Sequence, residues 1–410
     1  MRSALRDRAI SRLWAGQALS SIGDEIYRVG LTWMAVGLLG KDTGLLNAGQ
    51  AAALMILSFV GGRWADRWEP LQTMVWIDGI RAGVVLLPVA VSLFHPVPLG
   101  LLVAVALVLA SLGAFFDPAL QATLPHFARE PRLLRSANGL MSTTIRLARM
   151  VGPTLVGLLS NVVPMIHFFT LDALTFIGSA WSVRSIGGTV PAAADGSGER
   201  ASFSRAIAAG FRTVSAAPGM PFILGLKALT GGTWNLAFML GIALLVQQLA
   251  PGDARAFGLV MACYGAGNFV GALYFGNHRR PHPGRLMFAG YALFGAGFIA
   301  LGFAPGIGSM MAAAAFSGFA GPMNELAFSD TIQARFPARE ISRVFRLRMA
   351  VETLSTLLFT GVSPLLFRGI GVRGTIVFCG LAWLVSGLLG FARIGRVEEE
   401  ERQAARLRSS

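Results

Sequence analysis

Charged residues are scarce in this chain of 410 residues: Asp, Glu, Lys and Arg make up 14% of it, against about 25% in an ordinary soluble domain. A soluble protein of this length needs far more polar surface, so a soluble enzyme and a disordered chain are both excluded. With only two cysteines, a disulfide scaffold is excluded as well. Because 54% of the residues are hydrophobic, an integral membrane protein with many helices remains.

Residues for catalysis and metal binding are also few. Only five histidines are present. His278 and His282 flank an Arg-Arg-Pro segment with no third ligand near, which argues against a metal site. His167 and Asp172 have a spacing found in some acyltransferases, but they lie in an apolar run without a phosphate-binding loop. No glycine-rich ATP-binding loop is present. We therefore expect neither an enzyme nor a cofactor.

Hydrophobic runs dominate what the sequence does contain. A membrane-spanning helix needs about 20 mostly apolar residues, and by this measure the chain has twelve candidate spans. This predicts an all-α integral membrane protein. The spans are expected at 12–39, 45–64, 71–94, 98–121, 137–162, 165–186, 219–249, 256–276, 284–304, 308–329, 345–368 and 372–393.

The basic residues predict how these spans are oriented. With the N-terminus placed in the cytoplasm, 26 of the 35 Lys and Arg residues fall on cytoplasmic segments, and four fall outside. This positive-inside pattern predicts a multi-pass protein of the inner (plasma) membrane with both termini cytoplasmic. It also explains the net charge of +14 without nucleic acid binding. The expected partners are the lipid bilayer and a small-molecule substrate, and we expect a monomer.

One long polar stretch divides the chain. We expect six helices in 1–186, a cytoplasmic linker in 187–218, six more helices in 219–393 and a cytoplasmic tail in 394–410. Within the linker, Phe203, Ile207, Phe211 and Val214 recur at helical spacing, which predicts an amphipathic helix on the inner membrane face. Short segments of the two halves also match weakly at an offset of about half the chain, which favours a six-plus-six repeat.

The loop after the second span reads Gly62-Arg63-Trp64-Ala65-Asp66-Arg67. It resembles the signature of the major facilitator superfamily at that place: a glycine, three residues, then Asp-Arg. The resemblance implies that Gly62, Asp66 and Arg67 help to hold a cytoplasmic gate shut, with Asp78 and Arg81 beside them. The pattern departs after Arg67, where Trp-Glu-Pro replaces the usual glycine and second basic residue.

A second motif lies on the fifth span. Gly152 and Pro153, followed by Gly157, partly resemble the antiporter motif of drug exporters, and small residues there let two helices approach closely. With Gly23-Asp24, the segment 135–140 and the segment 333–337, the chain resembles the exporter branch that includes macrolide efflux proteins and the enterobactin exporter. The arginine motif that other drug antiporters carry on their fourth helix is absent from 106–118.

Charges within the spans are costly, so they mark structural pairs or functional sites. The spacing predicts three ion pairs within single helices: Asp24 with Arg28, Asp78 with Arg81, and Arg348 with Glu352. Glu325 has no basic residue within one turn. Asp24 and Glu25 are candidates for proton coupling because the resemblance implies that the first span lines the transport cavity. Glu325 is a third candidate because a buried carboxyl that lacks a basic partner can bind a proton.

The intramembrane cations point to substrate instead. Arg146 and Arg149 lie three residues apart on one helix face, where they repel each other unless an anion or an acid such as Asp172 lies between them. Arg146, Arg149, Lys227 and the aromatic Trp234 are therefore candidates for substrate binding. A structural Arg–Asp cluster is the alternative.

The resemblance and these charges together predict proton-coupled export of a small amphipathic compound, a drug or a siderophore, by alternating access. One alternative is a transporter of the same fold for a lysophospholipid or another metabolite. The other is a non-transporting membrane scaffold or enzyme.

Overall fold

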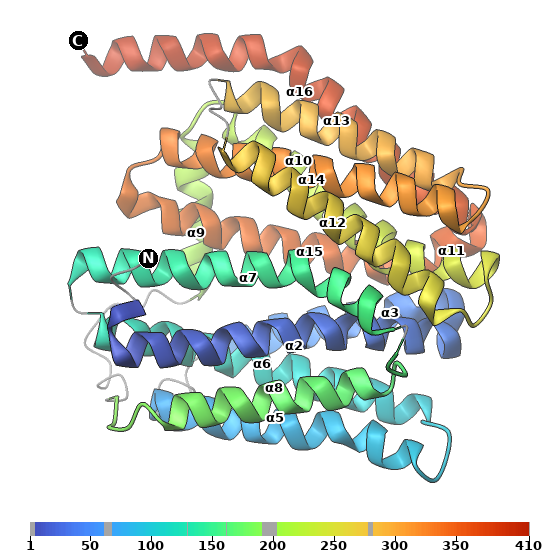
Figure 1. The fold of residues 1–410 in the computed structure, drawn as a ribbon. Coiled ribbons are helices and arrows are strands. Elements are labelled where there is room, and N and C mark those ends of the chain that lie inside the picture. The colour runs from blue at the N-terminus through green and yellow to red at the C-terminus, as the bar shows by residue number, and fades with distance from the viewer. Residues whose placement is uncertain are drawn as a thin grey trace. The chain divides into compact units, whose positions relative to one another are not determined.

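The computed structural model describes residues 5–60, 68–128, 130–160, 162–190, 203–277 and 282–409. All regular structure in these ranges is helical. The chain divides into two compact units, Met1–Glu199 and Arg200–Ser410, and each is described by itself (Figure 1). The boundary between them lies inside 187–218.

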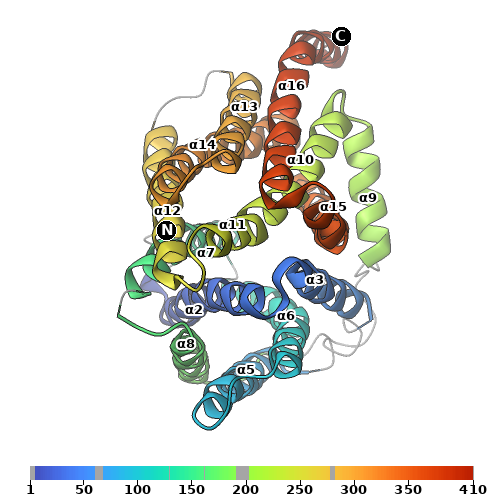
Figure 2. The same ribbon diagram turned by 90° about the vertical axis from the view of Figure 1, so that its right-hand side faces the viewer.

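Within the described ranges, the N-terminal unit has six long helices. Helix α2 packs on α7 and α8, α5 lies between α6 and α8, and α3 packs on α6, as the view in Figure 2 also shows for the helices of this unit. The helices are α2 (Arg8–Leu39), α3 (Thr43–Val60), α5 (Pro70–Ser92), α6 (Leu99–Phe127), α7 (Pro131–Leu159) and α8 (His167–Arg184), with a short 3₁₀ turn at Gly40–Asp42 after α2.

Acidic side chains start two of these helices. Asp7 caps α2 by accepting from the backbone N–H groups of Ala9 and Ile10, at 3.0 and 2.9 Å. Glu69 caps α5 in the same way, and Pro70 occupies the first helical position, where its missing N–H costs nothing. The departure of the signature loop after Arg67 is thus explained, because Glu69 and Pro70 form the start of α5. Gly62, Asp66 and Arg67 themselves lie outside the described residues.

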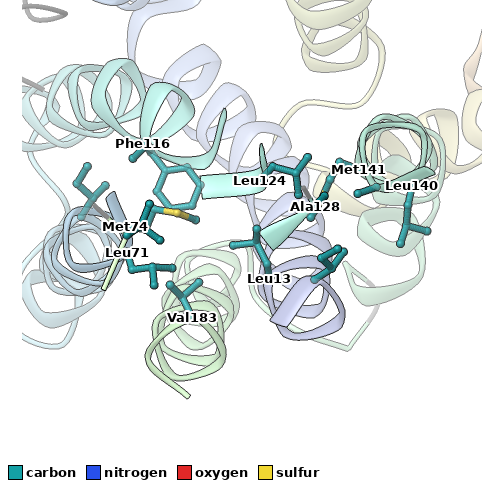
Figure 3. Packing of buried hydrophobic residues seen from close by; sticks show 14 residues of the cluster. Leu13, Leu71, Met74, Phe116, Leu124, Ala128, Leu140, Met141 and Val183 are labelled. Atoms are coloured by element: carbon teal, nitrogen blue, oxygen red, sulfur yellow. The ribbon is translucent and has the colours of Figure 1, made fainter. Parts of the chain in front are cut away.

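A hydrophobic cluster fills one end of this unit (Figure 3). Phe116 of α6 and Met74 of α5 face each other there, with Val183 of α8 beside Leu71. Leu13 of α2 and Met141 of α7 belong to the same cluster. Burial of such side chains contributes about 1.5–3 kcal/mol each in water, and in a membrane the gain comes from close packing instead.

The C-terminal unit, where it is described, has eight α-helices, of which α9 and α11 are short. Helix α14 lies against both α12 and α13, α16 packs along α13, and α15 contacts α10 and α9 (Figure 2). The helices are α9 (Phe203–Ser215), α10 (Met220–Trp234), α11 (Ile242–Leu249), α12 (Ala254–Asn277), α13 (Pro283–Gly302), α14 (Ile307–Arg335), α15 (Ala338–Gly369) and α16 (Gly371–Ser409).

Helix α9 coincides with the amphipathic segment expected in the linker. Its Val214 is buried and its Gly210 lies against the backbone of Arg343 on α15. Phe211, expected on the apolar face that meets the membrane, is 64% exposed. The helix therefore covers α15 with its small residues and leaves this aromatic ring uncovered.

The seventh expected span, 219–249, is not a uniform α-helix. A π-helical segment, Asn235–Gly241, joins α10 to α11. Such π segments are rare and occur often at functional sites. Elsewhere in this unit, the rings of Phe294 on α13 and Trp383 on α16 lie 4.3 Å apart, and Tyr291 meets Trp383 edge-on.

Each of the twelve expected spans overlaps a described helix or, for 219–249, a continuous helical run, whereas 61–64 and 161 lie outside the described residues. Seven of the described helices are long and apolar enough to cross a membrane by length and composition alone. Helices such as α2 and α7 carry several charged residues within their length, which lowers their hydropathy. The seven are Pro70–Ser92, Leu99–Phe127, Met220–Leu249, Ala254–Asn277, Pro283–Gly302, Arg343–Gly369 and Gly371–Arg393.

Candidate functional site

Asp24 and Glu25 lie at the middle of α2, about 24 Å along a helix of about 48 Å. Arg28 forms an ion pair with Glu25, one turn before it, and not with Asp24 as expected. The two acids are adjacent in sequence, so their side chains leave the helix in directions about 100° apart and a single guanidinium favours one of them. Asp24 is exposed, whereas Glu25 is buried.

The pair expected on α5 is present. Arg81 lies 3.6 Å from Asp78, measured from Nη1 to Oδ1, and both side chains are buried. The Arg81 guanidinium also lies over the rings of Phe116 and Phe176, at 4.8 and 5.4 Å from their centroids. The two residues stand about 12 and 16 Å from the start of this helix of about 34 Å. They are therefore near mid-helix, inside the unit.

Asp172, on α8, is 0% exposed and lies directly against α2. A Cβ atom at Gly23 would come within 2.6 Å of its Oδ1, so only glycine permits this approach. Thr175 donates a hydrogen bond to Asp172 at 3.4 Å. Asp172 is within electrostatic range of Asp24, Arg81 and Asp78.

These residues form what we call the acid-rich cluster: Asp24, Asp78, Arg81 and Asp172, with Asp117 of α6 also within electrostatic range of Asp24. Glu25 is not counted in this cluster, because it pairs with Arg28. Among the described side chains, the carboxyls of Asp24, Asp78 and Asp172 outnumber the one cation, Arg81. Both carboxylate oxygens of Asp78 and one of Asp172 are buried without a hydrogen-bond partner. Buried oxygens of this kind cost free energy unless a proton or another cation accompanies them.

Helix α7 approaches α2 at the level of this cluster. A Cβ atom at Gly152 would lie 2.5 Å from the Cβ of Glu25, so the glycine of the partial antiporter motif is what brings the two helices together. The expected close approach of α7 is therefore present at Gly152. The side chains of Pro153, Arg146 and Arg149 lie outside the described part of α7.

A second cluster lies in the C-terminal unit. Glu325 of α14 was expected to lack a basic partner, and this is wrong: Lys227 of α10 and Arg348 of α15 both bind it. Arg348 reaches Glu325 Oε2 at 2.9 Å, and its Nε donates to Glu352 at 2.8 Å, as predicted within α15. We call these four residues the balanced cluster, since two acids meet two cations.

Exposure within the balanced cluster is uneven. The Lys227 side chain is 4% exposed, whereas that of Glu325 is 47% exposed. Both cations also lie over the ring of Phe328, Lys227 at 5.5 Å and Arg348 at 4.8 Å. Lys227, a candidate for substrate binding, is enclosed and pairs with the protein's own carboxylate. The side of the cluster that is open to solvent is acidic.

Trp234 lies on α10 and belongs to an aromatic stack. Three residues earlier on the same helix, Gly231 lies beside Glu352 of the balanced cluster, since a Cβ atom added there would be 3.3 Å from the Cγ of Glu352. Its ring stacks on Phe238 with centroids 5.0 Å apart, and Phe238 lies 4.1 Å from Tyr264. The Trp234 indole N–H donates to the Tyr264 hydroxyl at 3.2 Å. Phe238 lies in the π-helical segment, so the stack forms where the helix geometry changes.

Almost the whole chain matches one known protein family. A family model described as transmembrane secretion effector matches residues 2–407. The chain belongs to this family of major facilitator transporters. No curated protein sequence matches it significantly.

Solved transporters share the fold of this secretion-effector chain. A POT family transporter, PepTSo, matches with a TM-score of 0.70 at 12% identity over 96% of this chain and 99% of its own. A bacterial homologue of the human lysosomal transporter Spinster, inward-facing and unoccupied, matches with 0.70 at 14% over 94% and 96%. A mutant of the nucleoside transporter NupG matches with 0.68 at 10% over 93% and 99%. The expected all-α major facilitator fold is confirmed.

Sequence reasoning missed the link from Lys227 to Glu325 and the position of Asp172 beside Asp24. A signal for the first existed. A lysine inside an apolar span needs an acid, and in the C-terminal spans the sequence offers Glu325 and Glu352. For the second, the sequence offers only the seven-residue spacing of Gly16, Gly23 and Gly30, which all lie against α8 in the structure; this spacing indicates a close-packing face of α2 and not which residue meets it.

Proposed function

We propose that this transporter exports a small amphipathic molecule, a drug or a siderophore, in exchange for protons and by alternating access. Its family and fold make it a membrane transporter. The observation that carries the proposal for proton exchange is the surplus of carboxyls over cations in the acid-rich cluster. A bound proton removes the uncompensated charge, so binding and release of that proton can be linked to a change of state.

Asp24 is the residue we propose for exchanging this proton with water. It stands at mid-helix, its side chain is exposed, and it lies within electrostatic range of Arg81. Asp24 is preferred to Glu25, which pairs with Arg28, and to Glu325, which pairs with two cations. One proton moving down the gradient supplies about 2.3 kcal/mol per 100 mV, which is enough to drive uphill export.

The aromatic stack supports an amphipathic substrate. Trp234 is only partly buried and is held in place by its hydrogen bond to Tyr264, so its ring is available to a planar apolar group. We retain Arg146 and Arg149 as the proposed determinants of an anionic substrate. Lys227 no longer supports that role, because Glu325 already neutralises it.

The substrate is identified by mass spectrometry of medium and cell extract from a deletion strain and its complemented parent, in iron-replete and iron-starved culture. We expect one compound to accumulate inside the deletion strain and to disappear outside. An endogenous chelator identifies siderophore export, and accumulation of added antibiotics alone identifies drug export. If neither class of compound changes, the proposed export is refuted.

Coupling is then tested with the purified protein in proteoliposomes. An imposed pH gradient is expected to drive uphill movement of the identified compound, and a protonophore is expected to abolish it. Asp24→Asn should keep expression and downhill movement but lose the gradient-driven part. Gradient-driven transport at the wild-type rate by this variant would remove Asp24 from the mechanism.

A further inference from the structure

We propose that Asp172 is the buried resting site of the coupling proton and that Asp24 is the entrance through which this proton reaches water. This inference rests on the proton coupling proposed above. It adds a residue on α8 to the transport machinery and gives the two aspartates different tasks.

The two carboxyls differ most in exposure. Asp172 is fully buried on α8, whereas Asp24 is exposed at the middle of α2. Asp24 is within electrostatic range of Asp172, and Gly23 leaves room for the Asp172 carboxyl beside the α2 backbone. A solvent-accessible acid next to an enclosed one is the arrangement that a two-step proton transfer requires.

When Asp24 and Asp78 are ionised, the surroundings of Asp172 favour the protonated form of its carboxyl. Its Oδ2 is buried without a hydrogen-bond partner, and the same is true of the Tyr27 hydroxyl nearby. Arg81 is the only cation that the described residues place within electrostatic range of it, and Arg81 already pairs with Asp78. A proton on Asp172 removes the negative charge of its carboxylate and supplies a hydrogen-bond donor for a neighbouring oxygen.

A metal ion fits this place less well than a proton. The described residues hold no group of three or more His, Cys, Asp or Glu side chains arranged for a metal. Hard cations such as Ca²⁺ take six to eight oxygen ligands. In the transfer itself, the O–H bond of a protonated Asp24 breaks and an O–H bond on the Asp172 carboxylate forms, with no other change in bonding.

Other titratable or charged groups face the two aspartates from the surrounding helices, and each enters any interpretation of pH dependence. The side chains of Arg146 and Arg149 on α7 lie outside the described set. The groups are Glu25, Tyr27 and Arg28 on α2, Asp78 and Arg81 on α5, and Asp117 on α6.

The test uses infrared spectroscopy of the purified full-length protein, because a protonated carboxyl has its own carbonyl stretch and shifts in heavy water. At neutral pH the wild type is expected to show this band, and Asp172→Asn is expected to lose it. Glu130→Gln is the matched control, since Glu130 is exposed and makes no capping hydrogen bond. A band that persists unchanged in Asp172→Asn refutes the proposal.

Asp24→Asn gives a second measurement that does not depend on the folding of the first variant. The band should remain, but its isotope shift after mixing with heavy water should be slower by roughly 100-fold, because the entrance carboxyl is gone. Unchanged exchange refutes the relay. Transport separates the two proposals: no gradient-driven export by the wild type overturns the coupling itself, whereas wild-type coupling in Asp172→Asn overturns only this inference.

Discussion

Glu325 and Lys227 form an ion pair whose two ends are unequally buried, and this predicts unequal effects of removing them. Glu325→Gln leaves the Lys227 ammonium enclosed at 4% side-chain exposure without its carboxylate. Breaking a buried pair in this way costs about 3–5 kcal/mol. Lys227→Met leaves Glu325 half exposed and still bound by Arg348. Removing this half-exposed pair is like removing a surface ion pair, so the free energy of unfolding should fall by about 1 kcal/mol or less.

The assay is thermal unfolding of each variant in detergent. At about 2–4 °C per kcal/mol for a unit of this size, Glu325→Gln should unfold roughly 6–20 °C below the wild type, and Lys227→Met no more than about 4 °C below. The double variant removes both charges and should recover most of the loss. Because Glu325 is assigned a structural task, the double variant should also keep gradient-driven transport.

Two results would refute this reasoning. Equal destabilisation by the two single variants would show that burial does not set the cost. A double variant as unstable as Glu325→Gln alone would show that the buried, unpaired Lys227 is not what destabilises the protein. A stable double variant that has lost gradient-driven transport would return Glu325 to the list of proton carriers.

Two further predictions concern packing and substrate. Gly152→Ala places a Cβ atom against Glu25 and should cost about 1–3 kcal/mol in thermal unfolding. Gly139→Ala on the same helix, where an added Cβ meets nothing within 4 Å, should be neutral or stabilising, and equal effects would contradict the close approach. Trp234→Ala should raise the KM for a planar aromatic substrate by about 2–10-fold, from the usual worth of one aromatic pair. Trp181→Ala, which removes a tryptophan that is 74% exposed, is the control, and equal KM values in the two variants would remove Trp234 from the substrate site.

The helices were predictable because a hydrophobic run of membrane length has few other folds. Pairs within one helix turn were predictable for the same geometric reason, as Arg348 with Glu352 shows. That geometry also explains the one wrong pair. Glu25 and Asp24 both lie about one turn before Arg28, so spacing alone could not choose between them.

Contacts between helices were beyond the reach of spacing. Lys227 and Glu325 are 98 positions apart, and nothing local indicates that α10 and α14 meet there. Asp172 approaches α2 at Gly23, which with Gly16 and Gly30 recurs every seven residues on α2, and all three glycines lie against α8. This spacing indicates a close-packing face on α2, but it does not tell which helix or which side chain packs there.

The two clusters differ in how their carboxyls are balanced by cations, and on this difference we base the proposal of a structural task for one and proton transport for the other. In the balanced cluster every acid has a cation at ion-pair distance, so protonating Glu325 would break bonds to two cations. In the acid-rich cluster, protonating Asp172 breaks no ion pair and supplies a missing donor. This difference in ion pairing, and not depth in the membrane, is why we propose Asp24 and Asp172 rather than Glu325 as carriers of the transported proton.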